Sequence, residues 1–263
     1  MAQNYYDVAI LGATFLGLGA ALKMKRAIVI EKGNFFGAEF INSYKVCKSK
    51  LIHSKTELGD HFVRNLRSRK LISENGDIYQ APAMYVLSEY LKEKSIEILL
   101  VTETIEVKRE NGDYYITVYH AKGFETIVAK TLLDTTLDGI GVREKEGRKL
   151  CKTLNSIMFN PKKNMIDNLS YNMASGLYTY VLPISLEKTK FEAMEDFFAM
   201  GNMLYANDMK ISSIAPEFSY HLDPFEREVE NGHIWNPSVA YTNLVEAFDM
   251  GVLMAERIEY DYT

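Results

Sequence analysis

The sequence predicts an α/β fold, with a parallel sheet extended by antiparallel strands and a smaller α+β unit beside it. Three observations predict this class. Residues 6–33 run as strand, glycine turn, helix and strand, residues 103–129 contain three short strands separated by turns, and residues 178–221 combine strands with an amphipathic helix. The 263 residues are 47% hydrophobic, which is enough for one good core, or for one large and one small domain.

The first unit has a clear local logic. Residues 6–11 are largely apolar, as a buried parallel strand should be, residues 16–25 form the helix, and residues 27–31 form the second strand. Gly12 permits the sharp turn out of the first strand, and Gly17 lets the helix pack close to the sheet. This is the sequence form of a unit that binds a dinucleotide.

The chemistry of such a unit depends on its two ends. The N–H groups at the helix N-terminus attract a pyrophosphate, and Glu31 at the end of the second strand can accept hydrogen bonds from ribose hydroxyls. Glu31 would also repel a 2′-phosphate, which disfavours NADP. Thr14 stands where the middle glycine of GxGxxG is expected, so it either obstructs the pyrophosphate or donates its hydroxyl to it. The helix is about one turn short, because thirteen residues separate Gly17 from Glu31.

The remaining elements follow in order. We expect an aromatic-rich loop over 34–50, helices over 55–70 and 84–94, a buried strand over 96–101, and strands over 103–109, 114–120, 124–129 and 131–134. We then expect an irregular polar crossing over 150–176, a strand over 178–184, a helix over 186–204, one or two strands over 209–221, a turn over 235–237 and a helix from about 243. The predicted domains are 1–149 (with 41–80 as a possible helical excursion), 150–234 as a small α+β substrate or cap domain, and 235–263, which completes the first domain.

Three separated segments resemble one family. The start of the chain with Glu-Lys-Gly after the second strand, the strands of 103–129 leading into LLDTTLDG, and the C-terminal PSVAYTNLVEAFDMGVLMA are similar to segments of the FAD-dependent oxidoreductases of the two-dinucleotide-binding-domain flavoproteins, the glutathione-reductase-like Rossmann superfamily. Asp134, Thr135, Thr136, Asp138 and Gly139 match the second signature, and Leu137 stands where a glycine is common. The likeness covers roughly 5–40, 80–140 and 235–258.

This resemblance implies a Rossmann-like FAD-binding domain with a parallel sheet and β-meander, and FAD as the cofactor. It places the following residues around FAD: Gly12, Ala13, Thr14, Phe15 and Gly17 at the pyrophosphate turn, Glu31 with Lys32 at the adenosine ribose, Ile105 at adenine, Thr136 and Asp138 near the diphosphate or ribityl chain, and Asn243 and Leu244 at the flavin pyrimidine.

Candidates for the chemistry on the substrate side are few. Tyr44 and Cys47 follow the second strand, and His221 precedes Asp223, which could orient it as a base. For each of them, ordinary packing or surface exposure is the competing interpretation. The five histidines show no metal-ligand spacing, so we expect no metal site.

Composition and charge limit the kinds of partner that we expect for this protein. The net charge is −5 with no prominent basic patch, which disfavours nucleic acid, and no apolar run approaches the ~20 residues that span a bilayer. We expect a cytoplasmic protein that acts on a small molecule and that can form a homo-oligomer. The leading function is an FAD-dependent oxidoreductase. The alternatives are a non-catalytic subunit that has lost tight FAD binding and, third, an NAD-dependent dehydrogenase.

Overall fold

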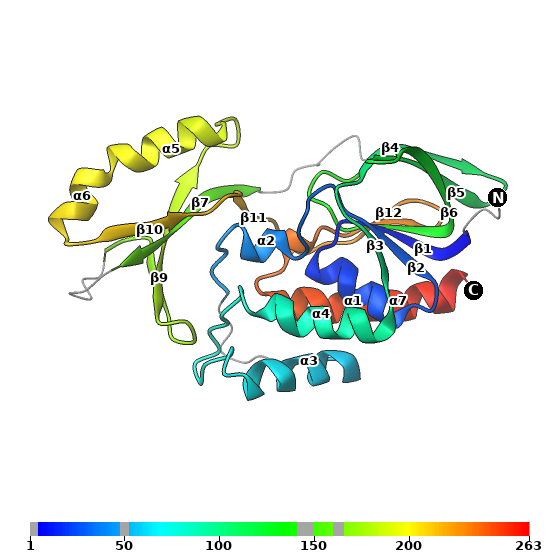
Figure 1. Cartoon of the computed structure of the whole chain (residues 1–263), viewed down its shortest axis with the longest axis horizontal. Helices are drawn as coiled ribbons and strands as arrows, with labels where there is room; N and C mark the ends of the chain where they lie inside the picture. Colours follow the sequence, from blue (N-terminus) through cyan, green and yellow to red (C-terminus); the bar gives the residue numbers. More distant parts are fainter. Residues whose placement is uncertain (1–4, 48–52, 141–149, 160–165, 263) are drawn as a thin grey trace.

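The computed structural model describes residues 5–47, 53–140, 150–159 and 166–262. It has a large lobe built on one sheet and a smaller lobe built on another (Figure 1). Both chain termini lie in the large lobe, on the side away from the small one (Figure 1). The predicted fold class is therefore confirmed: a mixed α/β lobe accompanied by a smaller α+β lobe, which we call the cap lobe (residues 151–221).

The large sheet is parallel at its centre. Strand β1 (Tyr5–Leu11) pairs in parallel with β2 (Ala27–Ile30) on one side and with β6 (Gly123–Asp134) on the other. Strand β3 (Glu97–Leu99) extends the sheet in parallel beyond β2. Since parallel strands end at the same edge, the residues that follow β1, β2 and β6 come together there.

Antiparallel strands complete this sheet. Strands β4 (Glu103–Glu110) and β5 (Asp113–His120) form the predicted meander with β6, which is one continuous strand where the sequence suggested two. On the other side of β6, β13 (His233–Trp235) pairs in parallel and β12 (Arg227–Glu230) pairs with β13. The predicted boundary after residue 234 thus falls at the end of β13, inside the large sheet.

Helices cover one face of the sheet (Figure 1). Helix α1 (Phe15–Lys23) packs on the long C-terminal helix α7 (Leu244–Tyr262), and glycines allow the close approach. A Cβ at Gly251 would lie 1.9 Å from the carbonyl oxygen of Leu16, and one at Gly19 would lie 2.2 Å from that of Phe248. Gly19 on α1 and Gly251 on α7 therefore allow the close contact between the helices.

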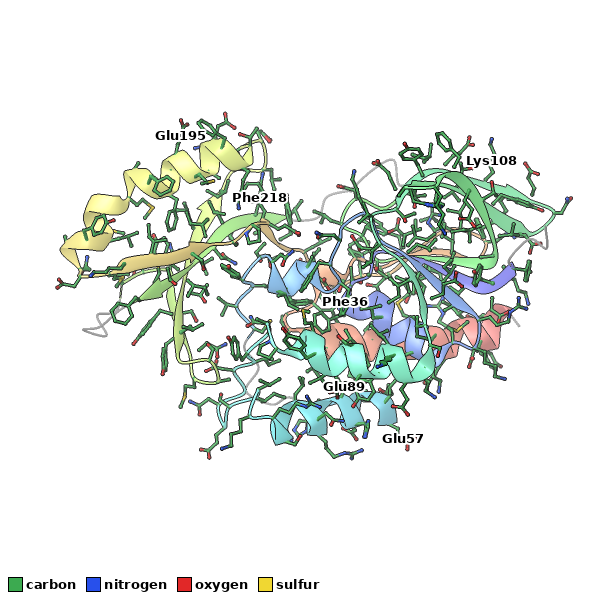
Figure 2. All side chains as sticks on the ribbon, in the orientation of Figure 1. Phe36, Glu57, Glu89, Lys108, Glu195 and Phe218 are labelled. Atoms are coloured by element: carbon green, nitrogen blue, oxygen red, sulfur yellow. The ribbon has the colours of Figure 1, made fainter. Side chains whose placement is uncertain are left out.

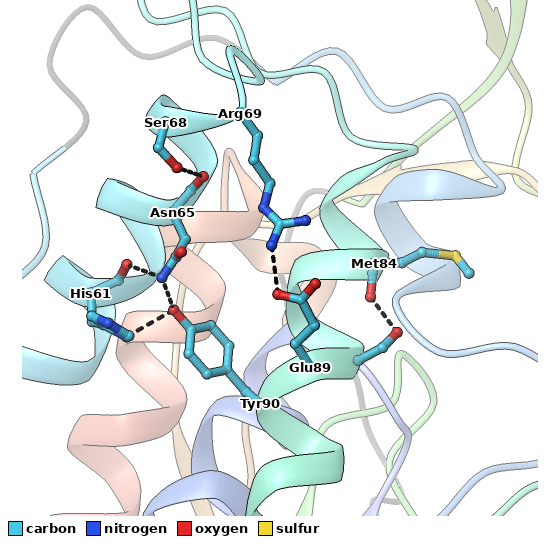
Figure 3. A network of polar contacts seen from close by, with 8 residues as sticks. His61, Asn65, Ser68, Arg69, Met84, Glu89 and Tyr90 are labelled. Carbon is cyan, nitrogen blue, oxygen red and sulfur yellow. Dashed lines mark hydrogen bonds and ion pairs between the residues drawn. The ribbon is translucent and has the colours of Figure 1, made fainter.

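Two further helices lie outside α1, namely α3 (Glu57–Ser68) and α4 (Ala83–Lys94). Polar contacts join them, as Figure 3 shows: the Tyr90 hydroxyl lies 2.9 Å from His61 Nδ1 and also accepts from the Asn65 amide. Arg69 pairs with Glu89 at 2.6 Å. Helix α3 lies within the predicted excursion of residues 41–80.

The cap lobe has its own sheet and core. Strand β7 (Cys151–Phe159) is central, with β9 (Leu177–Ile184) and β8 (Leu169–Asn172) on one side and β10 (Lys210–Ile214) and β11 (Ser219–His221) on the other. Helices α5 (Lys190–Ala199) and α6 (Gly201–Ala206) lie along one face of this sheet (Figure 1). Their buried side chains, among them Phe197 and Leu204, pack on sheet residues such as Leu154.

Several sequence predictions are wrong in detail. Residues 150–176 are not irregular, since they contain β7 and β8, and the helix predicted over 186–204 begins after Thr189 and breaks at Met200. The predicted loop over 34–50 includes the short helix α2 (Ala38–Ile41). The strand predicted to be buried over 96–101 is a three-residue edge strand that is partly exposed.

Candidate functional site

A cavity of about 450 Å³ opens at the carboxyl edge of the large sheet, between the two lobes. The large lobe contributes the residues that follow β1, β2 and β6, and the cap lobe contributes Lys190 with the segment 216–220. Phe218, labelled in Figure 2, belongs to this cap segment and lies near the ammonium groups of Lys152 and Lys190. The volume lies in the range of small-molecule sites. The full lining is Gly12, Ala13, Thr14, Glu31, Ala38, Glu39, Thr135, Thr136, Leu137, Lys190, Pro216, Glu217, Phe218, Tyr220 and Val239.

The turn after β1 has the geometry of a tight strand-to-helix connection. Gly12 has a φ of +92°, which favours glycine, and a Cβ on Gly17 would lie 2.4 Å from the Gly12 carbonyl oxygen. Thr14 is the N-cap of α1: its hydroxyl accepts from the Gly17 N–H at 3.0 Å and donates to Thr135 Oγ1 at 2.7 Å. Thr14 therefore holds the turn closed, a role that differs from both of the roles considered from the sequence.

Glu31 also holds this turn. Its carboxylate accepts from the N–H of Ala13 at 2.7 Å and from the N–H of Gly33 at 2.6 Å, so it joins the turn after β1 to the end of β2. A carboxylate has about four lone-pair sites, so these two bonds leave acceptor capacity toward the cavity. The predicted contact of Glu31 with a ribose is compatible with this position.

Glu39 is a second carboxylate at the turn, and sequence reasoning missed it. Its Oε1 accepts from the Phe15 N–H at 2.7 Å and from the Ser238 hydroxyl at 2.8 Å. The Leu16 N–H in turn donates to Ser238 Oγ at 3.4 Å. Glu39 Oε2 is buried and has no hydrogen-bond partner within the parts of the chain that the structure describes. Glu39 thus places a carboxylate directly at the N-terminus of α1.

Burial governs the protonation of this carboxyl group. Loss of solvent raises the pKa of Glu39 from 4.5 to about 7, against the opposing effect of its hydrogen bonds and of the nearby Lys45 ammonium. Lys45 is itself buried, and its Nζ donates to the carbonyl oxygens of Tyr220 at 3.0 Å and of Val239 at 2.7 Å. Burial lowers the pKa of Lys45 to about 8. Lys45 therefore joins the cap lobe to the large lobe beside the cavity.

The residues present fit a dinucleotide only in part. Glu31, the cavity and the turn suit an adenosine ribose, whereas the first N–H groups of α1 already have partners. Phe15 donates to Glu39, Leu16 to Ser238, and Gly17 to Thr14. A diphosphate placed at this helix end would meet the Glu39 carboxylate. In this conformation, therefore, the N-terminus of α1 does not fit the diphosphate.

The second predicted segment forms a turn around Asp134. This buried carboxylate accepts from the Thr136 N–H at 2.9 Å, the Thr136 hydroxyl at 2.6 Å and the Ile140 N–H at 2.6 Å. Burial raises the pKa of Asp134, and these hydrogen bonds oppose the rise. Thr136 and Leu137 line the cavity, whereas Asp138 lies on the surface. Asp134 thus shapes the loop that presents Thr136 to the cavity.

The other predicted cofactor residues lie further away. Lys32 is exposed and pairs with Glu103 at 2.8 Å, and Ile105 lies in β4 beside a β-bulge. The Asn243 side chain caps α7 through its bonds to the N–H groups of Val245 and Glu246. The Leu244 N–H donates to the sulfur of Cys47. None of these predicted residues lines the 450 Å³ cavity within the described part of the chain.

The three residues predicted as candidates for catalysis lie in different environments. Cys47 is fully buried, and burial raises the pKa of its thiol to about 11, which keeps it in the unreactive thiol form. His221 is exposed in β11. Tyr44, with a φ of +48°, lines a second cavity of about 300 Å³ between α2 and the cap sheet. The structure therefore does not bring Tyr44, Cys47 and His221 together.

The sequence alone does not identify Glu39 and Ser238 as residues of the site. Glu39 follows Gly37, whose φ of +71° and N–H bond to the Ala13 carbonyl oxygen at 2.8 Å dock α2 on the turn. Ser238 comes from the short 3-10 helix η1 (Ser238–Ala240), more than two hundred residues along the chain. Gly37 and Glu39 both follow β2 closely, but the sequence does not show which atoms meet.

No model of a known protein family matches the chain, and no curated protein does either. The described residues contain no group of three or more His, Cys, Asp or Glu side chains arranged to hold a metal ion. Among the helices that the structure describes, none is long and apolar enough to cross a membrane.

Solved structures establish the class of the fold. The architecture, with its parallel sheet, meander and cap lobe, is the Rossmann-like fold of FAD-binding flavoproteins. A geranylgeranyl bacteriochlorophyll reductase-like protein from Thermoplasma acidophilum has a TM-score of 0.68 and 13% identity, over 100% of this chain and 81% of that one. A flavoprotein/dehydrogenase from Cytophaga hutchinsonii has a TM-score of 0.63 and 11% identity, over 97% and 78%.

A third structure contains the cofactor. The glycerol-3-phosphate dehydrogenase from Bacillus halodurans, complexed with FAD, has a TM-score of 0.63 and 14% identity, over 99% of this chain and 65% of that one. At these identities the likeness defines the fold alone, and it extends through both lobes.

Proposed function

We propose that this chain is an FAD-dependent oxidoreductase of the glutathione-reductase-like superfamily that acts on a small molecule in the cytoplasm. The observation that carries the proposal is the cavity of about 450 Å³, which lies where the parallel strands of an FAD-binding fold end and the cap lobe closes over them. Ligands of open α/β sheets bind at this edge.

The residues of the cavity have separable roles in this proposal. Glu31 accepts hydrogen bonds from the adenosine ribose while it holds the turn, and Phe218 and Tyr220 shield the cavity from water on the cap side. The flavin, when bound, supplies the electron transfer, and the protein supplies binding and orientation.

The second cavity gives the substrate a polar site. Its cap-sheet wall carries serine and threonine hydroxyls, and its other wall carries Phe40, Tyr44 and Tyr79. This combination suits a ring or chain that bears hydrogen-bonding groups. The hydroxyl-bearing residues are Ser170, Ser175, Thr179, Ser212 and Ser213.

A specific observation also favours the second candidate, a non-catalytic subunit of the same fold. Glu39 fills the helix end at which the diphosphate of FAD is expected, so the cofactor would be absent if this arrangement were permanent. Within the residues that the structure describes, no observation favours an NAD-dependent dehydrogenase.

Reconstitution with FAD distinguishes the two candidates. After incubation with FAD and gel filtration, the oxidoreductase should carry flavin absorption near ~450 nm. Glu31→Gln should reduce the retained flavin, because it weakens the acceptor for ribose and for the Ala13 N–H. Glu103→Gln is the matched control, since this exposed carboxylate pairs with the exposed Lys32 and does not line the cavity, and it should retain flavin as the unaltered protein does. A folded protein that retains no flavin would refute the proposal that this chain is an FAD-dependent oxidoreductase.

A further inference from the structure

The N-terminus of α1 is occupied by a carboxylate of the chain itself. Glu39 Oε1 lies 2.7 Å from the Phe15 nitrogen, within the usual distance for a charge-assisted hydrogen bond. An anion is stabilised at a helix N-terminus because the N–H groups point at it and the helix dipole favours negative charge. Glu39 therefore makes the interaction that the diphosphate of a dinucleotide would make at the same place.

Three separate segments build this contact. Helix α2 carries Glu39 and is docked on the turn through the bond from Gly37 N–H to the Ala13 carbonyl oxygen at 2.8 Å. Ser238 approaches from η1 and donates to the same carboxylate oxygen at 2.8 Å. Because the contact depends on a left-handed glycine and on a hydroxyl distant in sequence, it is a built feature of the fold.

The Glu39 carboxylate is only half satisfied in this position. Glu39 Oε1 accepts two hydrogen bonds, whereas the buried Oε2 has no partner among the residues that the structure describes. A buried carboxylate oxygen without a partner is costly, so the bound position of Glu39 is a compromise. Glu39 lines the 450 Å³ cavity, which gives its side chain space to move.

We propose that Glu39 is an internal competitor of the cofactor diphosphate: it occupies the N-terminus of α1 in the empty protein and leaves when a dinucleotide binds. This inference rests on the proposed function. Glu39 then determines how tightly the chain holds FAD, and it protects the helix end while the site is empty. It is a specificity-determining residue, since a ligand without a phosphate does not have to displace it.

Equilibrium dialysis with FAD at pH 8 tests the competition. Glu39→Ala, which removes the competing carboxylate, should tighten FAD binding by at least about tenfold, and Glu39→Gln, which keeps the shape without the charge, should give an intermediate dissociation constant. Glu217→Gln is the matched control. Glu217 lines the same cavity, but its oxygen accepts from Asn42 Nδ2 at 3.1 Å and is not bonded to α1, so its removal should change affinity by less than about twofold.

The amide signal of Phe15 gives a readout independent of activity. In ¹⁵N-labelled unaltered protein, FAD should shift this signal as the hydrogen bond to Glu39 is exchanged for one to phosphate, and Glu39→Gln should shift it before any ligand is added. Riboflavin, which has no phosphate, should bind the unaltered protein and Glu39→Ala equally.

Failure of the competition and failure of the proposed function would give different results. Equal FAD affinity of the unaltered protein, Glu39→Gln and Glu39→Ala would overturn the competition and leave the proposed function intact. Absence of FAD binding in all three folded proteins would overturn the proposed function and the competition together. Tightening by Glu217→Gln to the same extent would show that general charge in the cavity acts, and it would overturn the specific role of Glu39.

Discussion

Replacement of Glu39 by glutamine should make the protein more stable at neutral pH and should remove one component of its pH dependence. Burial raises the pKa of Glu39 in the folded state to about 7, above its ordinary value of 4.5. The folded protein therefore binds more protons at this group than the unfolded chain does between these values, so its contribution to stability falls as the pH rises from 4.5 to about 7. The gap corresponds to about 3 kcal/mol when the whole window is crossed.

Urea unfolding at pH 5 and at pH 7.5 measures this effect in both proteins. The free energy of unfolding of Glu39→Gln relative to the unaltered protein should rise by about 2–3 kcal/mol from the lower to the higher pH. Lys45 and Cys47 interact electrostatically with Glu39, but their pKa values of about 8 and about 11 lie above this pH range. Parallel pH profiles of the two proteins would refute a buried, raised-pKa carboxyl at this position.

Three further outcomes follow from other parts of the fold. Burial lowers the pKa of His233 from 6.5 to about 4, so the unaltered protein should lose stability in urea unfolding as the pH falls from 6.5 toward 4. His233→Gln should remove this loss. Identical acid profiles of the two proteins would contradict this prediction. Gly251→Ala should lower the free energy of unfolding by about 1–3 kcal/mol or more, because its Cβ would meet the Leu16 carbonyl oxygen, and an unchanged melting temperature would exclude this close contact. Asp249→Asn should cost roughly 1–3 kcal/mol, because Asp249 accepts from Thr56 and from Ser54 at the start of α3, and undiminished stability in urea would show that these bonds are dispensable.

The sequence was sufficient where local patterns decide the structure. The β1–α1–β2 unit, the meander and α7 follow from apolar periodicity and hairpin turns, and all of them are present. The structure adds the close approach of α1 and α7, for which Gly251 leaves room.

The sequence was insufficient where contacts between residues distant in the chain decide the structure. Strand β7 looked like a polar crossing because of residues such as Asn155, yet this side chain is buried and donates to the Ser43 carbonyl oxygen at 2.9 Å. A polar residue satisfied by a distant backbone group is indistinguishable from a loop residue in the sequence alone. The predicted helix over 186–204 breaks at Met200, directly before Gly201, a residue that lowers helix propensity without fixing where a helix ends.

The same reason limits the prediction of the site. Gly12, Thr14, Glu31 and Thr136 could be placed near one edge of the sheet because each follows a predicted strand, and the structure finds all four at the cavity. Which donor meets which acceptor could not be predicted. Thr14 caps its own helix, and Glu39 reaches α1 only because Gly37 docks α2 on the turn.

The absorption spectrum of the unaltered protein after reconstitution with FAD at pH 6 tests directly whether this cavity is a flavin site. Below its pKa of about 7, Glu39 is mostly protonated, so its competition with the diphosphate is weakest. We expect a flavin band near ~450 nm that co-elutes with the folded protein at this pH. A folded protein that stays colourless at pH 6 in excess FAD would contradict the claim that this cavity is a flavin site.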